Sequence, residues 1–245
     1  MNKLIVKKSS ELSLKKTKNL LDVTRKILTP RNNITVVDDS WMERIWAWAD
    51  ENDIDENKLP RDKSGLTNLK RLFLGDNNLT ELPKEIGQLT NLEGLFLGDN
   101  NLTELPKEIG QLTNLQDLRV GKNNLTGLPK EIGQLTNLEI LVLRDNNLTE
   151  LPKEIGQLTN LQVLSLYDDN LTELPKEIGQ LANLQILQII TFTGLPKEIL
   201  NLTNLEQLRI DPSCTLSIEQ EVWLTEQGVE VMDVHHDSYM ERTFP

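Results

Sequence analysis

The sequence is poor in the residues on which disulfides, metal sites and most catalytic centres depend. Its 245 residues include one cysteine, Cys214, and two histidines, His235 and His236. A single cysteine excludes an intrachain disulfide and favours a reducing compartment. The two histidines are adjacent and have no Cys or His partner at ligand spacing, so we expect them to be solvent-exposed. Because glycine loops for phosphate, GxSxG and HExxH are also missing, we predict no enzyme activity, metal or cofactor.

Aromatic residues, positive charge and long apolar runs are scarce as well. Aromatic residues make up 4% of the chain, so aliphatic side chains must form most of the core. The formal net charge of −12 argues against nucleic acid as a partner, because phosphates require a basic surface. The apolar run LIV near the N-terminus is too short for a secretion signal, and no transmembrane segment is found. We expect a cytoplasmic protein, or one exported without a recognisable signal peptide.

Positive charge is concentrated near the N-terminus. Residues 1–34 contain nine Lys or Arg residues against Glu11 and Asp22, a net charge of +7, which leaves −19 on the rest of the chain. Such an asymmetry predicts a segment with a separate role. We therefore assign residues 1–39 as a basic, partly ordered leader, with a transport signal, an ordered extra element or an expression remnant as alternatives.

The most informative feature of the sequence is one motif repeated with a fixed period. The residues NNLTELPKEIGQLTNL occur unchanged at 77–92, 100–115 and 146–161, and at 123–138 with Gly127 as the only difference. Leucine heads each copy of the pattern LxxLxLxxN at 23-residue intervals. Consecutive copies in register indicate a repeat architecture, in which each unit buries its apolar face against its neighbours.

The spacing within the repeat predicts its local structure. In LxL the two leucines point to one face and the middle residue to the other, so stacked copies would form a parallel sheet with strands about 4.8 Å apart. Asn77 and its counterparts end the strands, and their amides are predicted to form a hydrogen-bonded ladder. Pro83 is predicted to start a short convex helix, which Gly87 would end. The repeated residues are thus explained as scaffold.

The N-terminal end of the array departs from the repeat. We assign residues 40–58 as a helical cap, in which Trp41, Ile45 and Trp48 share one face of a helix. A tryptophan stripe could be a ligand site. Because this helix would lie beside the open end of the leucine core, we interpret the stripe as a cover for that core.

The C-terminal end departs from the repeat in a different way. The repeat array is assigned to residues 59–212, the C-terminal cap to residues 213–235 and a loose tail to residues 236–245. Within the cap, Ser217 and Gly228 are predicted to start and stop a helix, which a closing strand follows.

The repeat itself changes before this cap. Asp169 replaces the ladder asparagine, and an ionised carboxylate accepts hydrogen bonds but does not donate them. We therefore predict that the asparagine ladder ends after Asn146, and that curvature or twist changes between Ser165 and Leu195.

The motif LxxLxLxxNNLTELPKEIGQLTN resembles the 23-residue class of leucine-rich repeats, which occurs in intracellular Ras-scaffold proteins and in bacterial repeat proteins. The near-identical copies and the tryptophan-rich cap resemble the bacterial group most. The resemblance implies an α/β fold, a right-handed solenoid with a parallel concave sheet and short helical segments on its convex side. It also implies a non-enzymatic module, expected to be monomeric, that binds a protein or peptide on its concave face.

The positions that differ between copies are the candidates for partner binding. They face outward from the predicted sheet, and an apolar patch beside Arg and Tyr is typical of a protein-binding surface. The alternative is that these side chains only pack on one another. We favour the end of the face near Tyr167 and Ile190. The candidate residues are Phe73, Phe96, Arg119, Ile140, Val142, Arg144, Val163, Tyr167, Asp168, Ile186 and Ile190.

Two functions of other classes stay open. The repeats could be the substrate-recognition part of a bacterial ubiquitin-ligase-type effector, with Cys214 as the only possible thiol nucleophile. Nothing in the surrounding sequence DPSCTLS indicates an activated thiolate, however. A structural or surface-adhesive role is the other possibility.

Overall fold

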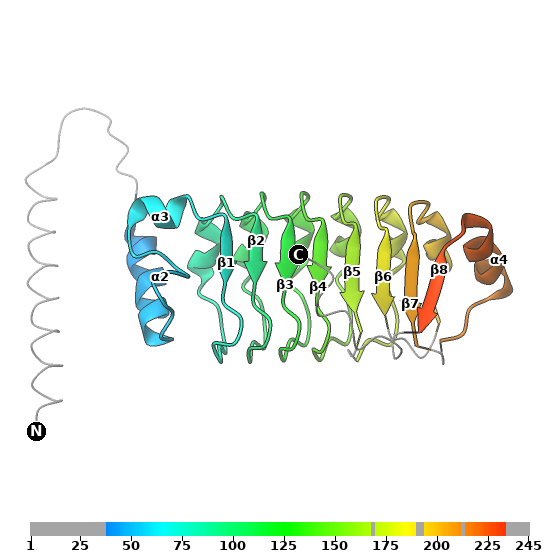
Figure 1. Cartoon of the computed structure of the whole chain (residues 1–245), viewed down its shortest axis with the longest axis horizontal. Coiled ribbons are helices and arrows are strands. Elements are labelled where there is room, and N and C mark those ends of the chain that lie inside the picture. Colours follow the sequence, from blue (N-terminus) through cyan, green and yellow to red (C-terminus); the bar gives the residue numbers. More distant parts are fainter. Residues whose placement is uncertain (1–37, 168–169, 190–193, 212–213, 234–245) are drawn as a thin grey trace, which may run out of the picture. The chain divides into compact units, whose positions relative to one another are not determined.

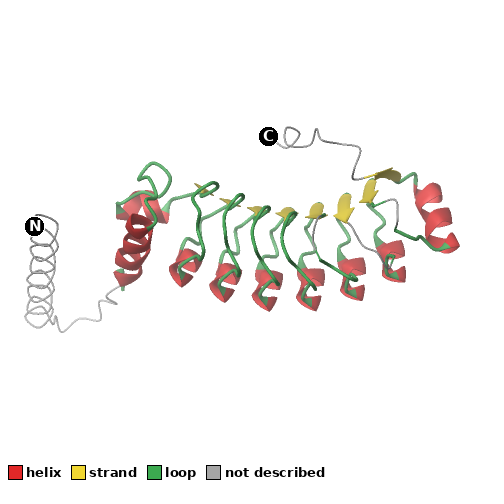
Figure 2. Ribbon diagram, turned by 90° about the horizontal axis from the view of Figure 1, so that it is seen from below, coloured by secondary structure: helices red, strands yellow, loops and turns green. Residues whose placement is uncertain are grey.

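The computed structural model describes residues 38–167, 170–189, 194–211 and 214–233. Internal contacts divide the chain into two units, Met1–Asp39 and Ser40–Pro245, and the fold described below is that of the second. It contains a parallel sheet of eight strands arranged in sequence order (Figure 1). Figure 2 shows the strands along the inner side of a shallow arc, with a row of short helices along the outer side. The predicted solenoid is therefore confirmed.

Each regular repeat contributes one strand and one 3-10 helix. The strands are β1 (Arg71–Phe73), β2 (Gly94–Phe96), β3 (Asp117–Arg119), β4 (Ile140–Val142), β5 (Val163–Leu166), β6 (Ile186–Ile189), β7 (Gln207–Ile210) and β8 (Glu230–Asp233). The 3-10 helices are η1 (Lys84–Gln88), η2 (Lys107–Gln111), η3 (Lys130–Gln134), η4 (Lys153–Gln157), η5 (Lys176–Gln180) and η6 (Lys197–Asn201). The α-helices are α2 (Ser40–Glu51), α3 (Lys63–Thr67) and α4 (Ile218–Gln227).

Leucine and isoleucine side chains fill the space between the sheet and the 3-10 helices. In the first regular repeat, Leu72, Leu74 and Ile86 are fully buried, as are their counterparts in the next repeats. Strands pair with equivalent positions side by side, for example Leu72 beside Leu95. Each repeat therefore buries its apolar side chains mainly against its two neighbours, and the core is a one-dimensional stack.

Buried asparagines link successive repeats at the ends of the strands. In Asn123, Nδ2 donates to the carbonyl oxygen of Leu97 in the preceding repeat (3.0 Å) and of Val120 in its own repeat (3.1 Å). Its Oδ1 accepts from the backbone N–H of Leu102 (2.9 Å). The same three kinds of bond are made by Asn100, Asn123 and Asn146. The predicted ladder is confirmed at these positions.

The two ends of the ladder differ from its middle. Asn77 is only half-buried, and its Nδ2 donates to the carbonyl oxygen of Gly75 in its own repeat (2.6 Å). Asp169, on which the predicted end of the ladder depends, lies outside the described residues. The predicted change of curvature or twist between Ser165 and Leu195 also stays a prediction.

The glycine of the 3-10 helix has a different role from the one that the sequence predicted. Gly87 lies inside η1 rather than at its end, and its φ is not positive. A Cβ atom at Gly87 would lie 2.5 Å from the carbonyl oxygen of Glu108 in the next repeat. Glycine is therefore required for close packing of adjacent 3-10 helices, and it does not terminate them. Pro83 likewise precedes η1 as its N-cap instead of forming its first residue.

Helix α2 covers the N-terminal end of the core, as predicted. Ile45 and Trp48 are buried, and Trp41 is half-buried against the same core. The Nε of Arg44 on α2 donates to Oε1 of Glu85 on η1 at 2.5 Å. The tryptophan stripe is therefore part of the cap rather than a ligand site.

Helix α4 and β8 form the C-terminal cap, also as predicted. Ser217 precedes α4, and its Oγ accepts from the N–H of Gln220 while Oε1 of Gln220 accepts from the N–H of Ser217 (3.2 and 2.9 Å). Gly228 ends the helix in the left-handed conformation, with φ of 70°. The predicted tail at residues 236–245 and nearly all of the leader lie outside the described residues.

Candidate functional site

The outward-facing side chains of β1–β8, which we call the concave face, are buried to very different extents. Along the column in the middle of the strands, Phe73 is 51% exposed, whereas Ser165 and Gln188 are 3% and 8% exposed. The Oγ of Ser165 donates to Oε1 of Gln188 at 2.8 Å, so this buried pair satisfies itself. Among the described residues of this face, the most exposed bulky apolar side chain is therefore at the N-terminal end.

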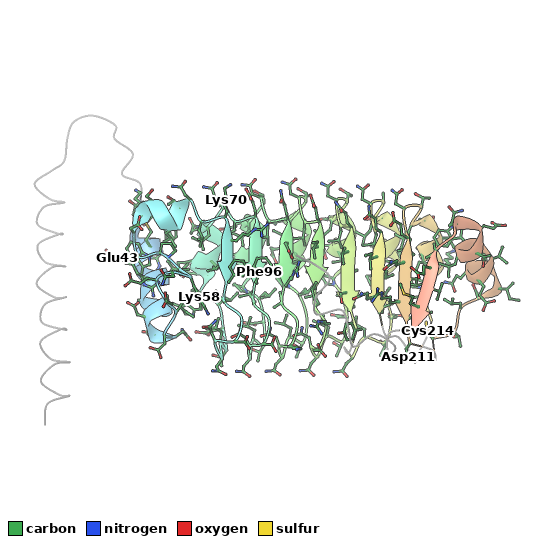
Figure 3. All side chains as sticks on the ribbon, in the orientation of Figure 1. Glu43, Lys58, Lys70, Phe96, Asp211 and Cys214 are labelled. Atoms are coloured by element: carbon green, nitrogen blue, oxygen red, sulfur yellow. The ribbon has the colours of Figure 1, made fainter. Side chains whose placement is uncertain are left out.

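Three candidate residues from β1, β2 and β3 form one cluster, which we call the Phe–Arg stack. The ring centroids of Phe73 and Phe96 are 4.5 Å apart with planes inclined by 6°, and the guanidinium carbon of Arg119 lies 5.6 Å from the Phe96 centroid. Asp117 accepts two hydrogen bonds from Arg119, at 3.0 and 2.9 Å. Stacking and bidentate pairing hold these side chains in place before any partner arrives. Figure 3 labels Phe96 on the sheet.

Two further candidates form a second cluster, the Arg–Tyr pair. The Nη1 of Arg144 donates to the hydroxyl oxygen of Tyr167 at 2.7 Å, and the guanidinium carbon lies 5.6 Å from the tyrosine ring centroid. The same nitrogen lies 3.4 Å from Oδ2 of Asp145. Because these positions are one repeat apart in the sequence, neither residue alone predicted the contact.

A glycine on β2 and a glycine shortly after β3 make room for the two clusters. A Cβ atom at Gly94 would lie 2.8 Å from Cε2 of Phe96, and one at Gly121 would lie 3.1 Å from Cγ of Arg144. The absence of a side chain at these positions lets Phe96 and Arg144 lie flat on the sheet. The sequence analysis identified the large residues but missed the glycines that position them.

The remaining candidates lie on β4–β6 or outside the described residues. Ile140, Val142 and Ile186 are half-buried, and Val163 is buried with 7% exposure. They form the apolar part of the concave face. Asp168 and Ile190 lie outside the described residues.

A column of aspartates on the concave face has a backbone explanation. Residues at this position have φ near 56°, in the left-handed region that Asp tolerates better than most residues. The members of the column are Asp76 (56°), Asp99 (57°), Lys122 (56°) and Asp145 (57°). Lys122 is the exception in residue type, and its Nζ lies 3.7 Å from Oδ1 of Asp99.

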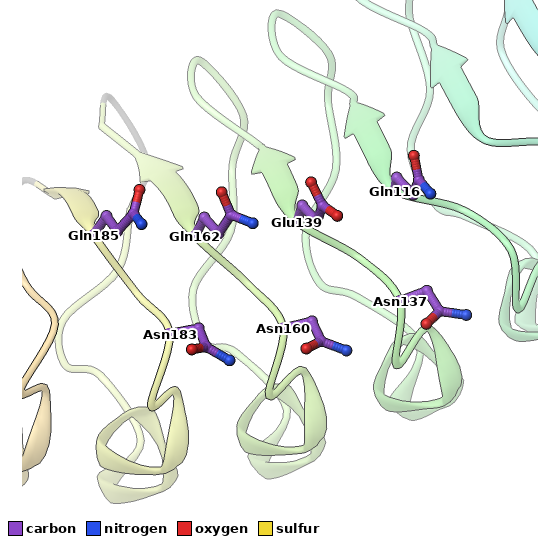
Figure 4. Close-up of a pocket in the computed structure, with 7 residues that line it drawn as sticks. All are labelled: Gln116, Asn137, Glu139, Asn160, Gln162, Asn183 and Gln185. Atoms are coloured by element: carbon purple, nitrogen blue, oxygen red, sulfur yellow. The ribbon is translucent and has the colours of Figure 1, made fainter.

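A polar groove that the sequence analysis did not predict runs beside the first residues of β3–β6 (Figure 4). Its volume is about 370 Å³, and it is lined by Gln116, Asn137, Glu139, Asn160, Gln162, Asn183 and Gln185. Each asparagine donates to a threonine carbonyl of the preceding repeat, as Asn137 does to Thr113 at 2.8 Å. The available signal was that the residue just before each strand from β2 to β7 is Glu or Gln, whereas Lys70 precedes β1. That column presents amide and carboxylate groups to hydrogen-bonding partners.

The sequence profile of the leucine-rich repeat region matches residues 50–145 and 140–226 of this chain. The matched residues make up more than half of the 245. The chain belongs to the leucine-rich-repeat family. The family resemblance drawn from the repeated motif is therefore confirmed.

Solved structures agree with this leucine-rich-repeat assignment. A leucine-rich-repeat protein of Leptospira interrogans is 40% identical, with a TM-score of 0.55, over 67% of this chain and 48% of that protein. A plant peptide hormone receptor, RGFR1 in complex with RGF2, is 36% identical with a TM-score of 0.55, over 69% and 25%. An internalin from Listeria monocytogenes shares the fold, with 22% identity and a TM-score of 0.59 over 69% and 48%. This chain thus spans about half the length of the bacterial proteins. A comparison with curated proteins gives no match.

The leucine-rich-repeat unit offers little for catalysis in its described part. Cys214 is half-buried and packs against the core, and the histidine pair at residues 235–236 lies outside the described residues. Among the described residues, no group of three or more His, Cys, Asp or Glu side chains is placed to hold a metal ion. No helix in the same segments is long and apolar enough to cross a membrane. What the concave face presents is a set of fixed contact groups.

Proposed function

We propose that this leucine-rich-repeat protein binds a protein or peptide on its concave face and catalyses no reaction. The observation that carries the proposal is that conserved and varying positions of the repeat have different structural roles. Residues that are identical between copies build the ladder and the core, whereas residues that differ form the Phe–Arg stack and the Arg–Tyr pair. Free variation on an idle, exposed sheet would favour polar residues, yet this face holds stacked aromatic and arginine side chains.

The two clusters suit binding because their geometry exists in the unbound protein. Aromatic and arginine side chains are enriched among the residues that dominate binding energy. Immobilising a flexible side chain costs about 0.5–1.5 kcal/mol on association, and the contacts of Arg119 and Arg144 reduce that cost. Half-buried Ile140 and Val142 on β4 add apolar surface near both clusters.

The charge on this face also favours recognition by contact. Over β1–β4 the exposed or half-exposed acidic and basic residues of the face are balanced, although the chain carries a net charge of −12. The acidic members are Asp76, Asp99, Asp117 and Asp145, and the basic members are Arg71, Arg119, Lys122 and Arg144. A balanced face selects a partner by matched pairs and shape rather than by net charge. The peptide hormone receptor similar to this chain supports a peptide or protein as the partner class.

The test is capture of partners from a lysate of the native source, followed by mass spectrometry and measurement of Kd with the purified partner. A variant with Phe73→Ala, Phe96→Ala and Tyr167→Ala should weaken binding by at least about tenfold, because truncating aromatic anchors costs about 2 kcal/mol or more. Its thermal midpoint should stay close to that of the wild type, since the three side chains lie outside the core.

The matched control replaces three exposed glutamates of the repeat, Glu81→Ala, Glu104→Ala and Glu150→Ala. Their removal should leave the same partner bound. If the glutamate variant loses the partner while the aromatic variant keeps it, the concave assignment is wrong. A second concave variant, Gly94→Ala, should shift Phe96 and weaken binding without removing any contact residue.

A further inference from the structure

The two caps of the solenoid differ in the large apolar side chains that they expose. The outer residues of α2, including Glu43, Arg44 and Asp50, are polar and exposed. At the C-terminal end the exposed residues include Ile218 (80%), Val222 (50%) and Val231 (47%). A terminal cap with a polar outer face keeps a solenoid soluble, and the exposed apolar residues of the C-terminal cap depart from this rule.

Ile218 and Val222 of α4 face away from the repeats. Gln220 and Leu224 are buried, and Nε2 of Gln220 donates to the carbonyl oxygen of Leu195 at 3.0 Å. Ile218 and Val222 lie two residues away, which is about 200° of rotation around the helix. Because the buried side is hydrogen-bonded in place, the Ile218–Val222 side is held outward on the helix that leads into β8 (Figure 1).

Strand β8 adds an open backbone edge to this surface. Its Glu230 donates a backbone hydrogen bond to Glu206 at 2.8 Å, so the N–H and C=O of Val231 point away from β7. Val231 occupies the core-facing column beside Leu208, which is fully buried, yet Val231 itself is half-exposed. Within the described part of the chain the sheet ends at β8, so no described strand lies beside the outward N–H and C=O of Val231.

The charge at this end is of one sign. Residues 211–233 contain six acidic residues and no Lys or Arg: Asp211, Glu219, Glu221, Glu226, Glu230 and Asp233. The three glutamates of α4 are exposed, and none forms an ion pair with another described residue. A second copy of this chain would bring the same charges to the edge, and like charges oppose strand pairing. A basic partner is complementary.

We propose that the C-terminal end is a second docking surface, where an extended segment of another protein, with alternating basic and apolar residues, pairs with β8. Main-chain hydrogen bonds to Val231 would supply affinity, as in other cases of strand addition. Apolar side chains on one face of that segment would cover Val231, and its basic side chains would meet the glutamates of the cap. This surface is separate from the concave face, so either proposal can fail alone.

The probe for this proposal is a fluorescent peptide of alternating lysine and valine residues, titrated with the full chain and followed by anisotropy. Val231→Pro removes an outward N–H while leaving the Glu230 bond to β7, and it should weaken binding about tenfold or more. A variant with Glu219→Gln, Glu221→Gln and Glu226→Gln should weaken binding and reduce its salt dependence. The same peptide with alternate backbone nitrogens methylated on one edge should bind more weakly, because it cannot pair fully.

The control variant carries Glu81→Gln, Glu104→Gln and Glu150→Gln, the same change in charge on the repeats, and it should bind the probe like the wild type. Equal loss in both glutamine variants would show attraction to net charge alone and would overturn the proposal. Should Val231→Pro lower the thermal midpoint, Ile218→Ser with Val222→Ser replaces it, because both side chains are exposed. Unchanged binding of the peptide by the double serine variant overturns the proposal. Self-association of the wild type in sedimentation, abolished in that variant, also overturns it, because the occupant would then be a second copy of the chain.

Discussion

The repeated frame and the concave face obey different constraints, although they alternate along every strand. A frame residue is fixed by contacts to an adjacent repeat: the side chain of Asn123 bonds to the repeat before it, and Gly110 packs against the repeat after it. A face residue such as Phe96 contacts its neighbours only across the surface. A change in the frame therefore disturbs buried packing or hydrogen bonds between repeats, whereas a change on the face disturbs only contacts at the surface. Residue types differ between copies of the repeat mainly on the concave face, where a substitution does not disturb the core. The candidate site is therefore assigned to that face.

Lys122 belongs to both regions. Its backbone adopts the left-handed conformation that the frame imposes, while its side chain lies at the edge of the concave face. The other members of its column are aspartates, which suit that conformation. The left-handed backbone at residue 122 favours Asp or Asn, whereas the residue present is lysine. A substitution at this position therefore measures the effect of the backbone preference and of the side-chain contact on stability.

The largest effect that separates frame from face is expected at the asparagine ladder. Asn123→Ala removes the buried amide and leaves the N–H of Leu102 and the carbonyl of Leu97 without that partner, so the free energy of unfolding should fall by about 3 kcal/mol. Urea denaturation followed by circular dichroism measures this. The adjacent exposed Asn124→Ala is the control and should change stability by less than about 0.5 kcal/mol. Equal losses at both positions would remove the distinction between frame and face.

Glycine gives the next largest contrast. A Cβ at Gly110 would lie 2.6 Å from the carbonyl oxygen of Glu131 in the next repeat, whereas one at Gly127 would meet no atom within 4 Å. Gly110→Ala should therefore destabilise the protein by about 2 kcal/mol through overpacking. Gly127→Ala should stabilise it by about 0.5 kcal/mol, because alanine restricts the unfolded chain. Thermal and urea unfolding of the two variants check the prediction, and a stable Gly110→Ala would show that neighbouring repeats can move apart at little cost.

The smallest effect on stability is expected at residue 122. Lys122→Asn should raise the free energy of unfolding by about 0.5 kcal/mol, because Asn adopts positive φ more readily than Lys. The reverse change at a matched site, Asn78→Lys at φ of 55°, should lower it by a similar amount. Calorimetric midpoints are sensitive enough to separate the two signs. A loss of stability in Lys122→Asn would mean that the ion pair with Asp99 outweighs the backbone preference.

The frame was predictable from the sequence because its determinants recur every 23 residues. The inward leucines and the ladder asparagines follow from the spacing, and both caps follow from helix signals where the repeat stops; the structure confirms them. Gly87 shows the limit of that reasoning, since its position near a helix end suggested a stop. Its actual role depends on the distance to Glu108 in the next repeat, which no pattern within one repeat contains.

The candidate site was predictable only as a set of positions. Sequence alone identified Phe96 and Tyr167 as outward-facing, because strand residues alternate between two faces. Only the tertiary structure decided that Phe96 lies between Phe73 and Arg119, and that Tyr167 pairs with Arg144. It also decided that Val231 ends the core column half-exposed. Periodicity is a property of the chain and fixes which face a side chain takes. The rotamer of a side chain, its burial and its contact partners depend on residues one repeat away. These are decided only when the repeats stack.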